Sequence, residues 1–579
     1  MSEYRAPVEE ILLHLRHIGE IEAIARLEEL EAADLETVRA ILEEAGKFAA
    51  GVLLPLRRLL DREPPRLVEG EVRMPQAVRE AYRRFSEGGW NGLVFPQQWG
   101  GQGLPWLLGG AVAEIWNAAS MTFELCPLLT QAGVEALLAH GSPEQQRVYL
   151  PPLVSGRWTA AMCLTEPQAG SDVGAARTRA ERDGERYRIF GQKIFITFGD
   201  HDLAENIVHF VLARLPGAPE GTRGLSLFLV PKFLPDADGR PGARNDLRCL
   251  KLEEKLGIHG SPTCVMSYGD EGGAVGFLLG EENRGMRCMF TMMNNARIAV
   301  GIEGLGIAEA AFQKALAYAR ERVQGRRDGR AVPIIAHPDV RRMLTTMRAV
   351  LVAMRALCQL TCAWVDRSYR EREPEARRRA AERVALLTPV CKAWCTDRAV
   401  EICSLALQVH GGIGYIEETG IAQLYRDVRI TPIYEGTNGI QAIDLVQRKL
   451  ALDEGRAPFA LFAELGEELA ALADSPLVDL LPRLEEALGI LERTTRGLQE
   501  AGRDDREAAA TPYLQLFGWS LGGFLLARLA RRAHADAAGE ALAGLARFYT
   551  QQLLPPALAL VPAVEAPSEM LPLELLPDM

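Results

Sequence analysis

Apolar residues recur with helical spacing along the first 160 residues of the chain. One stripe runs over Val8, Ile11, Leu12 and Leu15, at the intervals of three and four residues that form one face of an α-helix. Ser142 followed by Pro143 is a typical helix start, with serine as the N-cap and proline in the first turn. Glycine-rich loops such as 89–105 separate these helices, so we predict a helical segment.

Between residues 160 and 280 the pattern changes to that of β-strands. Three runs are rich in β-branched and aromatic residues, namely RYRIFGQKIFITF (186–198), NIVHFVLARL (206–215) and GLSLFLVPKFL (224–234). Asp183-Gly184 is a typical signal for a hairpin turn. We therefore predict a β domain in this part of the chain.

Helical spacing returns after residue 285 and continues to about 555. Thr388-Pro389 and Thr511-Pro512 are predicted to start two of these helices, because proline in the first turn loses no needed hydrogen bond. The apolar run 513–530 approaches the length of a membrane span, but it contains three glycines and an arginine and is predicted to be a buried core helix. The proline-rich end after residue 555 is predicted to be extended or disordered.

Composition and charge exclude several classes of protein. The chain has 579 residues, of which 48% are hydrophobic and 25% charged, as in folded rather than disordered or fibrous proteins. Its net charge of −12 repels phosphate backbones and argues against nucleic-acid binding. The first residues lack the basic and apolar regions of a signal peptide, so we expect a cytoplasmic protein without a membrane span.

The ten cysteines form no C-x-x-C motif and no framework typical of secreted proteins. Cys358 and Cys362, like Cys391 and Cys395, are four residues apart within apolar helical stripes. We interpret both pairs as core packing, with metal ligation as the alternative, and predict no metal site.

Motifs of P-loop nucleotide binding, zinc proteases and serine hydrolases are absent from the sequence. GIEGLG at 301–306 has the wrong spacing for a dinucleotide fingerprint and lies within a helical pattern. Common kinases, hydrolases and Rossmann enzymes are therefore disfavoured.

Two segments combine polar residues with glycine in a way that a packed core does not need. In MCLTEPQAGSDVG (162–174), hydroxyls, carboxylates and backbone N–H groups gather in a loop, which suits a ligand cradle or a capped turn. In ITPIYEGTNGIQAIDLVQRKL (430–450), Glu435 stands alone between apolar residues and a glycine. Such surroundings raise the pKa of a carboxyl group and suit a general base. Alternatively, Glu435 is an acidic residue at a helix start.

Together these segments resemble the acyl-CoA dehydrogenase family. Eight stretches match the family pattern in the right order: MCLTEPQAGSDV (162–173), GQKIFIT (191–197), EEKLGIHGSPT (253–263), GFLLGEENRGM (276–286), ARERVQG (319–325), ALQVHGGIGY (406–415), LYRDVRI (424–430) and IYEGTNGIQ (433–441). With about 125 residues after position 454, the chain is similar to the large bacterial subfamily that includes long-chain and 3-methylthiopropionyl-CoA dehydrogenases.

The resemblance implies a mainly helical fold with a β domain. Its four parts would be an N-terminal helical domain (1–160), a middle β-barrel or sandwich (161–282), a C-terminal four-helix bundle (283–454), and an extra helical domain with the proline-rich tail (455–579). FAD would lie between the first three. The extra domain is expected to cover the surface that smaller members use to form tetramers, leaving a homodimer.

The resemblance also implies an FAD-dependent enzyme that oxidises an acyl-CoA thioester to the trans-2-enoyl-CoA and passes electrons to an electron-transferring flavoprotein. Glu435 would remove the α-proton while flavin N5 accepts the β-hydride. Donors must stabilise the enolate oxygen, because an α-proton next to a thioester is only weakly acidic. In the family these donors are the backbone N–H of this glutamate and a ribityl hydroxyl of FAD.

The family pattern assigns further roles residue by residue. The residues implied for FAD binding are Met162, Leu164, Thr165, Gly170, Ser171, Phe195, Thr197, Arg322, Gln408, Gly411, Gly412, Thr437 and Asn438. Among them, Thr165 and Thr197 would bond the flavin ring, and Arg322 would meet the pyrophosphate across a dimer interface. The residues implied for substrate binding are Ser171, Asn294, Arg297, Tyr434 and Gly436.

Some positions depart from the family pattern. Phe195 stands where many members have tryptophan, Asn294 replaces a frequent aspartate, and about five extra residues follow Arg322. Ala296 occupies the position at which some relatives carry the base, so only Glu435 can serve. The methionines near position 290 either fill the core or line an acyl pocket.

Two alternatives remain open from the sequence. An acyl-CoA oxidase would share these residues but reoxidise its flavin with oxygen and release hydrogen peroxide. The other alternative is a non-catalytic flavoprotein that binds DNA or a partner protein. The net charge of −12 and the retained Glu435 count against it.

Overall fold

The structure is a computed structural model, and it describes every residue except 1–3, 28–33, 576, 578 and 579. The chain forms two compact units. The bundle unit comprises Met1–Lys47, Pro105–Ala118 and Arg297–Met579. The sheet unit comprises Phe48–Leu104 and Ala119–Ala296.

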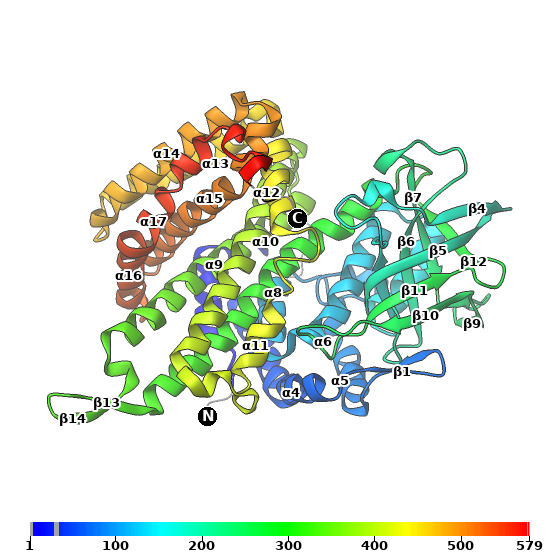
Figure 1. Ribbon diagram of the computed structural model, residues 1–579, viewed down its shortest axis with the longest axis horizontal. Coiled ribbons are helices and arrows are strands. Elements are labelled where there is room, and N and C mark those ends of the chain that lie inside the picture. The colour runs from blue at the N-terminus through cyan, green and yellow to red at the C-terminus, as the bar shows by residue number, and fades with distance from the viewer. Residues whose placement is uncertain (1–3, 28–33, 576, 578–579) are drawn as a thin grey trace. The chain divides into compact units, whose positions relative to one another are not determined.

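The sheet unit is built on one mixed sheet of eight strands, most of them antiparallel (Figure 1). The strand order is β10-β11-β5-β12-β7-β6-β3, with β4 beside β5. These strands are β3 (Trp158–Cys163), β4 (Arg179–Asp183), β5 (Arg186–Thr197), β6 (Asn206–Arg214), β7 (Leu225–Pro231), β10 (Leu247–Leu252), β11 (Thr263–Tyr268) and β12 (Ala274–Leu279). The three predicted strands are confirmed as β5, β6 and β7, and the last continues into β8 (Phe233–Pro235).

The hairpin predicted at Asp183-Gly184 joins β4 to β5. Asp183 pairs with Arg186 across a two-residue turn, and Gly184 has a φ of +64°, which glycine adopts without strain. The same register sets Ala180 opposite Ile189, and both side chains are fully buried in the core of the sheet.

Helices complete the sheet unit. They are α4 (Leu54–Arg62), α5 (Gln76–Glu87), α7 (Pro143–Val154) and parts of α6 (Trp106–His140) and α8 (Gly285–Glu321). α7 starts as predicted, because the Ser142 side chain accepts a hydrogen bond from the Gln145 backbone N–H. The Gln145 side chain accepts one from the Ser142 backbone N–H in return, which completes a capping box. Two short antiparallel pairs are separate from this sheet. β1 (Arg66–Val68) with β2 (Glu71–Arg73) precedes it in sequence, and β8 with β9 (Pro241–Arg244) lies in sequence between β7 and β10.

The bundle unit is helical. From the N-terminal segments it takes α1 (Val8–His17), α2 (Ile21–Ile24), all of α3 (Leu35–Phe48) except its last residue, and the first part of α6. Its central helices are the rest of α8, α9 (Pro338–Arg370), α10 (Pro374–His410), α11 (Ile421–Val428) and α12 (Asn438–Asp444). The C-terminal extension adds α13 (Ala457–Ala473), α14 (Leu481–Glu500), α15 (Arg503–Arg532), α16 (Gly539–Phe548), α17 (Leu554–Leu558) and α18 (Val561–Glu565). α15 packs against α9, α10 and α12 (Figure 1).

Two predicted helix starts are wrong. Pro389 lies inside α10 and Pro512 lies inside α15. Thr388 caps nothing, because its hydroxyl donates to the Val384 carbonyl one turn earlier at 2.7 Å. An interior proline costs a helix about 3 kcal/mol, and the buried residues on both sides of Pro389 offset that loss.

The C-terminal tail is more regular than predicted. α17 and α18 run through it, and prolines stand in their first turns, where proline favours a helix. Asp505 of α15 accepts hydrogen bonds from the Ser568 backbone N–H and hydroxyl, both at 2.8 Å. Contacts with α15 therefore hold the tail, which was predicted to be extended or disordered.

Long apolar helices are buried in the bundle unit. The run 513–530 lies in α15 and is largely buried, as predicted. α9 is long and apolar enough to cross a membrane by length and composition, and 89% of its apolar stretch is buried inside the protein.

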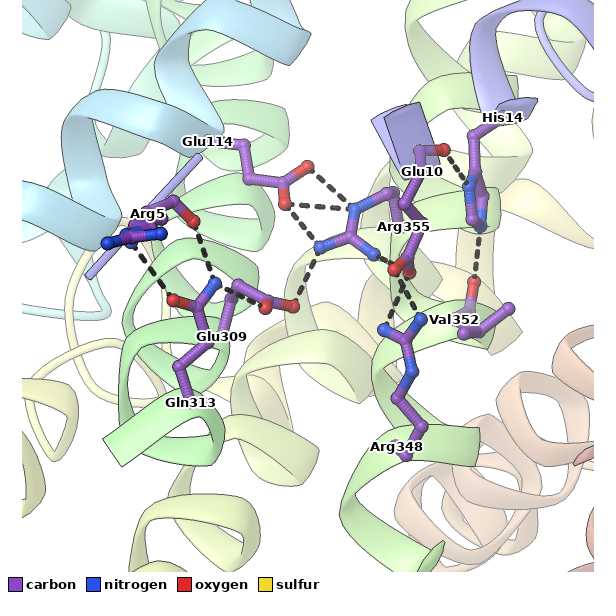
Figure 2. Close-up of polar contacts among 9 residues, drawn as sticks. All are labelled: Arg5, Glu10, His14, Glu114, Glu309, Gln313, Arg348, Val352 and Arg355. Atoms are coloured by element: carbon purple, nitrogen blue, oxygen red, sulfur yellow. Dashed lines mark hydrogen bonds and ion pairs between the residues drawn. The ribbon is translucent and has the colours of Figure 1, made fainter. Parts of the chain in front are cut away.

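A buried ionic network joins the three segments of the bundle unit (Figure 2). Arg355 of α9 is fully buried. Its guanidinium pairs with Glu10 of α1, Glu114 of α6 at 2.6 Å and Glu309 of α8 at 2.9 Å. Arg348 also pairs with Glu10. The network therefore ties the N-terminal helix to α9.

All ten cysteines are buried free thiols. The Cys358 sulfur of α9 lies 3.8 Å from that of Cys391 and 3.9 Å from that of Cys395, both on α10. The three thiols lie within 4.8 Å of one another in the contact between the two helices, an arrangement that fits core packing and could also hold a metal ion.

Candidate active site

Glu435 lies on a tight loop between α11 and α12. Glu435 has a φ of +56° and Gly436 a φ of +83°. The Asn438 backbone N–H donates to the Pro432 carbonyl at 3.0 Å and closes the loop. A positive φ is unfavourable for glutamate, and such strain is concentrated at functional sites. Thr437 caps α12 directly afterwards, because its hydroxyl accepts from the Ile440 backbone N–H.

The Glu435 carboxyl group is half-buried beside two cations of the bundle unit. Burial raises its pKa, while the charges of Arg297 and Lys392 lower it in part. The Arg297 guanidinium is 5% exposed and donates through Nε to the Glu435 backbone carbonyl at 3.3 Å. The Gln441 side chain also donates to this carbonyl, at 3.5 Å.

Lys392 and Glu303 are two ionisable residues of this site that the sequence pattern did not reveal. Lys392 of α10 is fully buried and donates through Nζ to Asn438 Oδ1 at 2.8 Å. Burial lowers the pKa of Lys392 to about 7, against the opposing charges of Glu435, Asp397 and Glu303. Lys392 and Glu303 each stand as a single ionisable residue within an apolar helical stripe of the sequence. This pattern is the signal that could have identified both residues.

Glu303 of α8 lies buried against the residue that precedes the candidate base. It accepts a hydrogen bond from the Tyr434 hydroxyl through Oε2, while Oε1 is buried without a hydrogen-bond partner among the described residues. Burial raises the pKa of Glu303 to about 8. This shift favours the protonated form of the carboxyl group at neutral pH.

The sheet unit carries the other candidate segment. The loop that follows β3 is tied to β5, because the Ile194 backbone N–H donates to the Thr165 carbonyl at 2.9 Å. Beneath it, buried Lys193 pairs with Glu166 at 2.8 Å and donates to the Leu164 carbonyl at 2.9 Å. This buried ion pair holds the loop in place, so Glu166 has a structural role within the segment 162–174.

Phe195 follows the residue of β5 that holds this loop, and it is unusually placed. Its side chain is 60% exposed and its φ is +58°. A large, mostly exposed aromatic ring at a strained position suits stacking on a planar ligand. Thr197 is half-buried two residues further along β5, and Gly170 and Ser171 are exposed at the end of the loop.

The remaining predicted residues divide between the two units. Met162 is buried in β3 and Leu164 and Thr165 are half-buried beyond it, all in the sheet unit. Asn294 is exposed on α8 one turn before Arg297. Exposed residues of the bundle unit are Arg322 at the end of α8, Gln408 in the last turn of α10, and Gly411 and Gly412 after it. The structure thus brings Arg297, Tyr434, Glu435, Gly436, Thr437 and Asn438 together in the bundle unit.

Two further predictions concern neighbouring segments. The extra residues after Arg322 form an exposed hairpin, β13 (Val323–Arg327) with β14 (Arg330–Pro333). In the methionine cluster, Met289 and Met292 are fully buried and Met293 is 9% exposed. These side chains are buried, which both interpretations, core filling and an acyl pocket, predict.

Four family models match the chain in order. They are "Acyl-CoA dehydrogenase, N-terminal domain" at residues 35–157, "middle domain" at 161–270, "C-terminal domain" at 283–450, and "Acetyl-CoA dehydrogenase C-terminal like" at 461–572. The last match covers most of the C-terminal extension.

Individual relatives extend this likeness over nearly the whole chain. The 3-methylmercaptopropionyl-CoA dehydrogenase of Ruegeria pomeroyi is 47% identical over 554 residues, which cover 93% of each chain. A butyryl-CoA dehydrogenase of Syntrophomonas wolfei is 37% identical over 74% of this chain and 73% of its own.

Solved structures share the fold. Caenorhabditis elegans ACDH-11 in complex with C11-CoA has a TM-score of 0.80 at 21% identity, over 98% of this chain and 93% of its own. An acyl-CoA dehydrogenase complexed with FAD from Bacillus anthracis has a TM-score of 0.75 at 23% identity, over 96% and 91%.

Proposed function

Because the chain belongs to the acyl-CoA dehydrogenase family, in which FAD-dependent enzymes oxidise acyl-CoA thioesters, we propose that Glu435 is its catalytic base. The single observation that carries this assignment is the loop of Glu435, which holds a half-buried carboxylate at positive φ beside two buried cations. The chain is an oxidoreductase that acts on CH–CH bonds, with FAD as its cofactor.

The surroundings of Glu435 suit removal of a weakly acidic proton. Burial raises the pKa of its carboxyl group, which brings the base nearer to the working pH and strengthens it as a proton acceptor. Arg297 and Lys392 counteract this shift, because their positive charges favour the ionised carboxylate. The proton of the substrate α-carbon would pass to a Glu435 carboxylate oxygen.

The backbone of the same loop offers a donor for the thioester. The Glu435 backbone N–H makes no hydrogen bond to any described residue. We infer that it donates to the thioester carbonyl and stabilises the developing enolate oxygen, because a preorganised N–H is most effective where charge develops. Arg297 supports this geometry by fixing the Glu435 carbonyl.

The residues proposed for FAD match its chemical groups. FAD, when bound, supplies the acceptor for the hydride from the β-carbon. Phe195 suits stacking on the flavin ring, and the hydroxyls of Thr165 and Thr197 suit hydrogen bonds to its edge. Exposed Arg322 suits the pyrophosphate, and Gly411 and Gly412 leave room for the cofactor because they have no side chain. Gln408, Thr437 and the backbone from Met162 to Ser171 complete the proposed set.

The substrate and partners are proposed from the relatives. The Ruegeria relative is named for 3-methylmercaptopropionyl-CoA, so we propose a short acyl-CoA, with this sulfur-containing thioester tested first. An electron-transferring flavoprotein is the proposed electron acceptor, and the cytoplasm is the proposed location. The exposed apolar side chains Ile413, Tyr415 and Ile416 support a homodimer.

The test is anaerobic bleaching of the flavin by a series of acyl-CoAs of increasing length. Wild-type enzyme is expected to bleach with short thioesters. Glu435→Gln is expected to slow bleaching roughly 10²–10⁴-fold while FAD and thioester still bind, because the amide keeps the size of the side chain but accepts no proton.

Glu454→Gln is the matched control. Glu454 is also a glutamate of the bundle unit at positive φ, 54°, but it is exposed and pairs with Arg456. Its variant should bleach like wild type. Bleaching of Glu435→Gln at a rate within tenfold of wild type would disprove the assignment, and hydrogen peroxide released in air would identify an oxidase instead.

A further inference from the structure

Asn438 anchors the loop of the proposed base to α10. Its backbone N–H closes the loop on the Pro432 carbonyl at 3.0 Å. Its side-chain Oδ1 accepts from Lys392 at 2.8 Å, and its Nδ2 donates to Thr396 Oγ1 at 2.9 Å and to Asp397 Oδ1 at 2.7 Å. The end of the loop is therefore fixed by one amide side chain that α10 surrounds.

Asp397 connects this anchor to the C-terminal extension. Its second carboxylate oxygen, Oδ2, accepts a hydrogen bond from Gln515 Nε2 of α15 at 2.6 Å. Asp397 and Gln515 are both half-buried, and hydrogen bonds to a charged group in such a setting are strong and polarise one another. A continuous relay runs from Gln515 through Asp397 and Asn438 to the loop of Glu435.

α15 is seated closely enough on α10 to fix Gln515. A Cβ atom at Gly518 would lie 2.4 Å from the Trp394 ring, so only glycine permits this approach. One helical position further, Trp519 packs edge-on against Trp394 with ring centroids 5.5 Å apart. The Arg398 guanidinium lies 4.9 Å from the Trp519 ring centroid.

We propose that the C-terminal extension is a working part of the active site, in which Gln515 is a positioning residue for the base. Gln515 holds the Asp397 carboxylate in the orientation that receives Asn438, and Asn438 holds the loop in its strained conformation. The inference rests on the proposed function, because it takes Glu435 as the base.

Loss of the Gln515 hydrogen bond is expected to act on the chemical step. Asp397 would then be free to rotate toward water, Asn438 would lose a charged acceptor, and the positive φ of Glu435 would be less well enforced. Small displacements of a catalytic group reduce the rate strongly. Binding of the thioester depends on other contacts and should change little.

The experiment compares Gln515→Leu with wild type in anaerobic flavin reduction. We expect kcat to fall about 5- to 20-fold, with KM and FAD content changed less than twofold. In an Asp397→Asn background, where the relay is already broken, Gln515→Leu should change kcat less than twofold, because coupled residues are not additive.

Gln499→Leu is the matched control within the same extension. Gln499 donates to the carbonyls of Leu450 at 2.8 Å and Gly455 at 2.9 Å, so its loss weakens the attachment of the extension without touching the relay. Its kcat should stay within twofold of wild type. Gln515→Met, of nearly the same length as glutamine, replaces Gln515→Leu if that variant does not fold.

The outcomes separate the two proposals. A kcat of Gln515→Leu within twofold of wild type, with a lowered Tm like that of Gln499→Leu, would reduce the extension to a structural role. Failure of wild-type enzyme to bleach with any thioester would instead contradict the proposed function.

Discussion

At the scale of single residues, Glu303 is a buried carboxyl group whose burial is only partly compensated. It is a carboxyl group fully buried on α8, with one oxygen bonded to Tyr434 and the other without a partner among the described residues. Burial raises its pKa to about 8, so folding takes up a proton that the unfolded chain releases near pH 4.5. Stability should therefore fall as pH rises between these two values.

Glu303→Gln is expected to remove this pH dependence, because the amide imitates the protonated acid. The stabilisation relative to wild type should be small at pH 5 and grow to on the order of 2–4 kcal/mol at pH 8. Denaturant unfolding at both pH values measures it. The exposed variant Glu454→Gln should follow the wild-type profile, and parallel profiles for Glu303→Gln and wild type would mean that Glu303 is ionised in the fold.

Prediction from sequence succeeded at residues whose local surroundings reveal their role. Glu435 stood out because apolar residues and a glycine flank it. Lys392 and Gln515 did not stand out, because each acts through a hydrogen bond to a residue distant in sequence. Lys392 bonds to Asn438 and Gln515 bonds to Asp397, and only the packing of α10, α12 and α15 brings these pairs together.

At the scale of elements, strands and the β4–β5 hairpin were predictable, while helix starts within long helices were not. A threonine before proline acts as a helix N-cap only when its hydroxyl accepts a hydrogen bond from one of the backbone N–H groups that follow it. Thr388 turns the other way, to Val384, and buried neighbours carry α10 through Pro389. Tertiary packing decided these boundaries against a local signal.

The contact between α10 and α15 yields a prediction for two glycines. Gly518→Ala is expected to destabilise the protein by about 1–3 kcal/mol, because its methyl group would overlap fully buried Trp394. Gly489→Ala, on the exposed face of α14 with open space around it, should stabilise by about 0.5–1 kcal/mol. Thermal unfolding of both variants checks the signs, and equal shifts would contradict the close packing of the two helices.

At the scale of the whole molecule, the order of helical and sheet blocks followed from the sequence, but the grouping of distant segments did not. The N-terminal helices pack with residues after 297 because of contacts such as those of Arg355. Hydrophobic periodicity shows which face of a helix is buried and carries no information about its partner.

Arg355→Met is expected to destabilise the bundle unit by roughly 3–5 kcal/mol, because it leaves buried carboxylates without their cation. Glu114→Gln in that background should recover part of the loss. Arg348 is 30% exposed in its side chain, so Arg348→Met should have a smaller effect. Denaturant unfolding with hydrogen exchange at α1 measures these changes, and an Arg355→Met variant as stable as wild type would contradict the role of the network.

The pairing of Glu10 with Arg355 also has a consequence for folding during synthesis, because the N-terminal helix must wait until its partner residue has been made. The two residues are 345 positions apart, so at ~5–20 residues per second the first waits roughly 20–70 s on the ribosome for the second. During that interval Ile11 and Leu15, both fully buried in the finished fold, have no finished surface to cover them. The emerging N-terminus is thus an early and long-lived target for a holding chaperone.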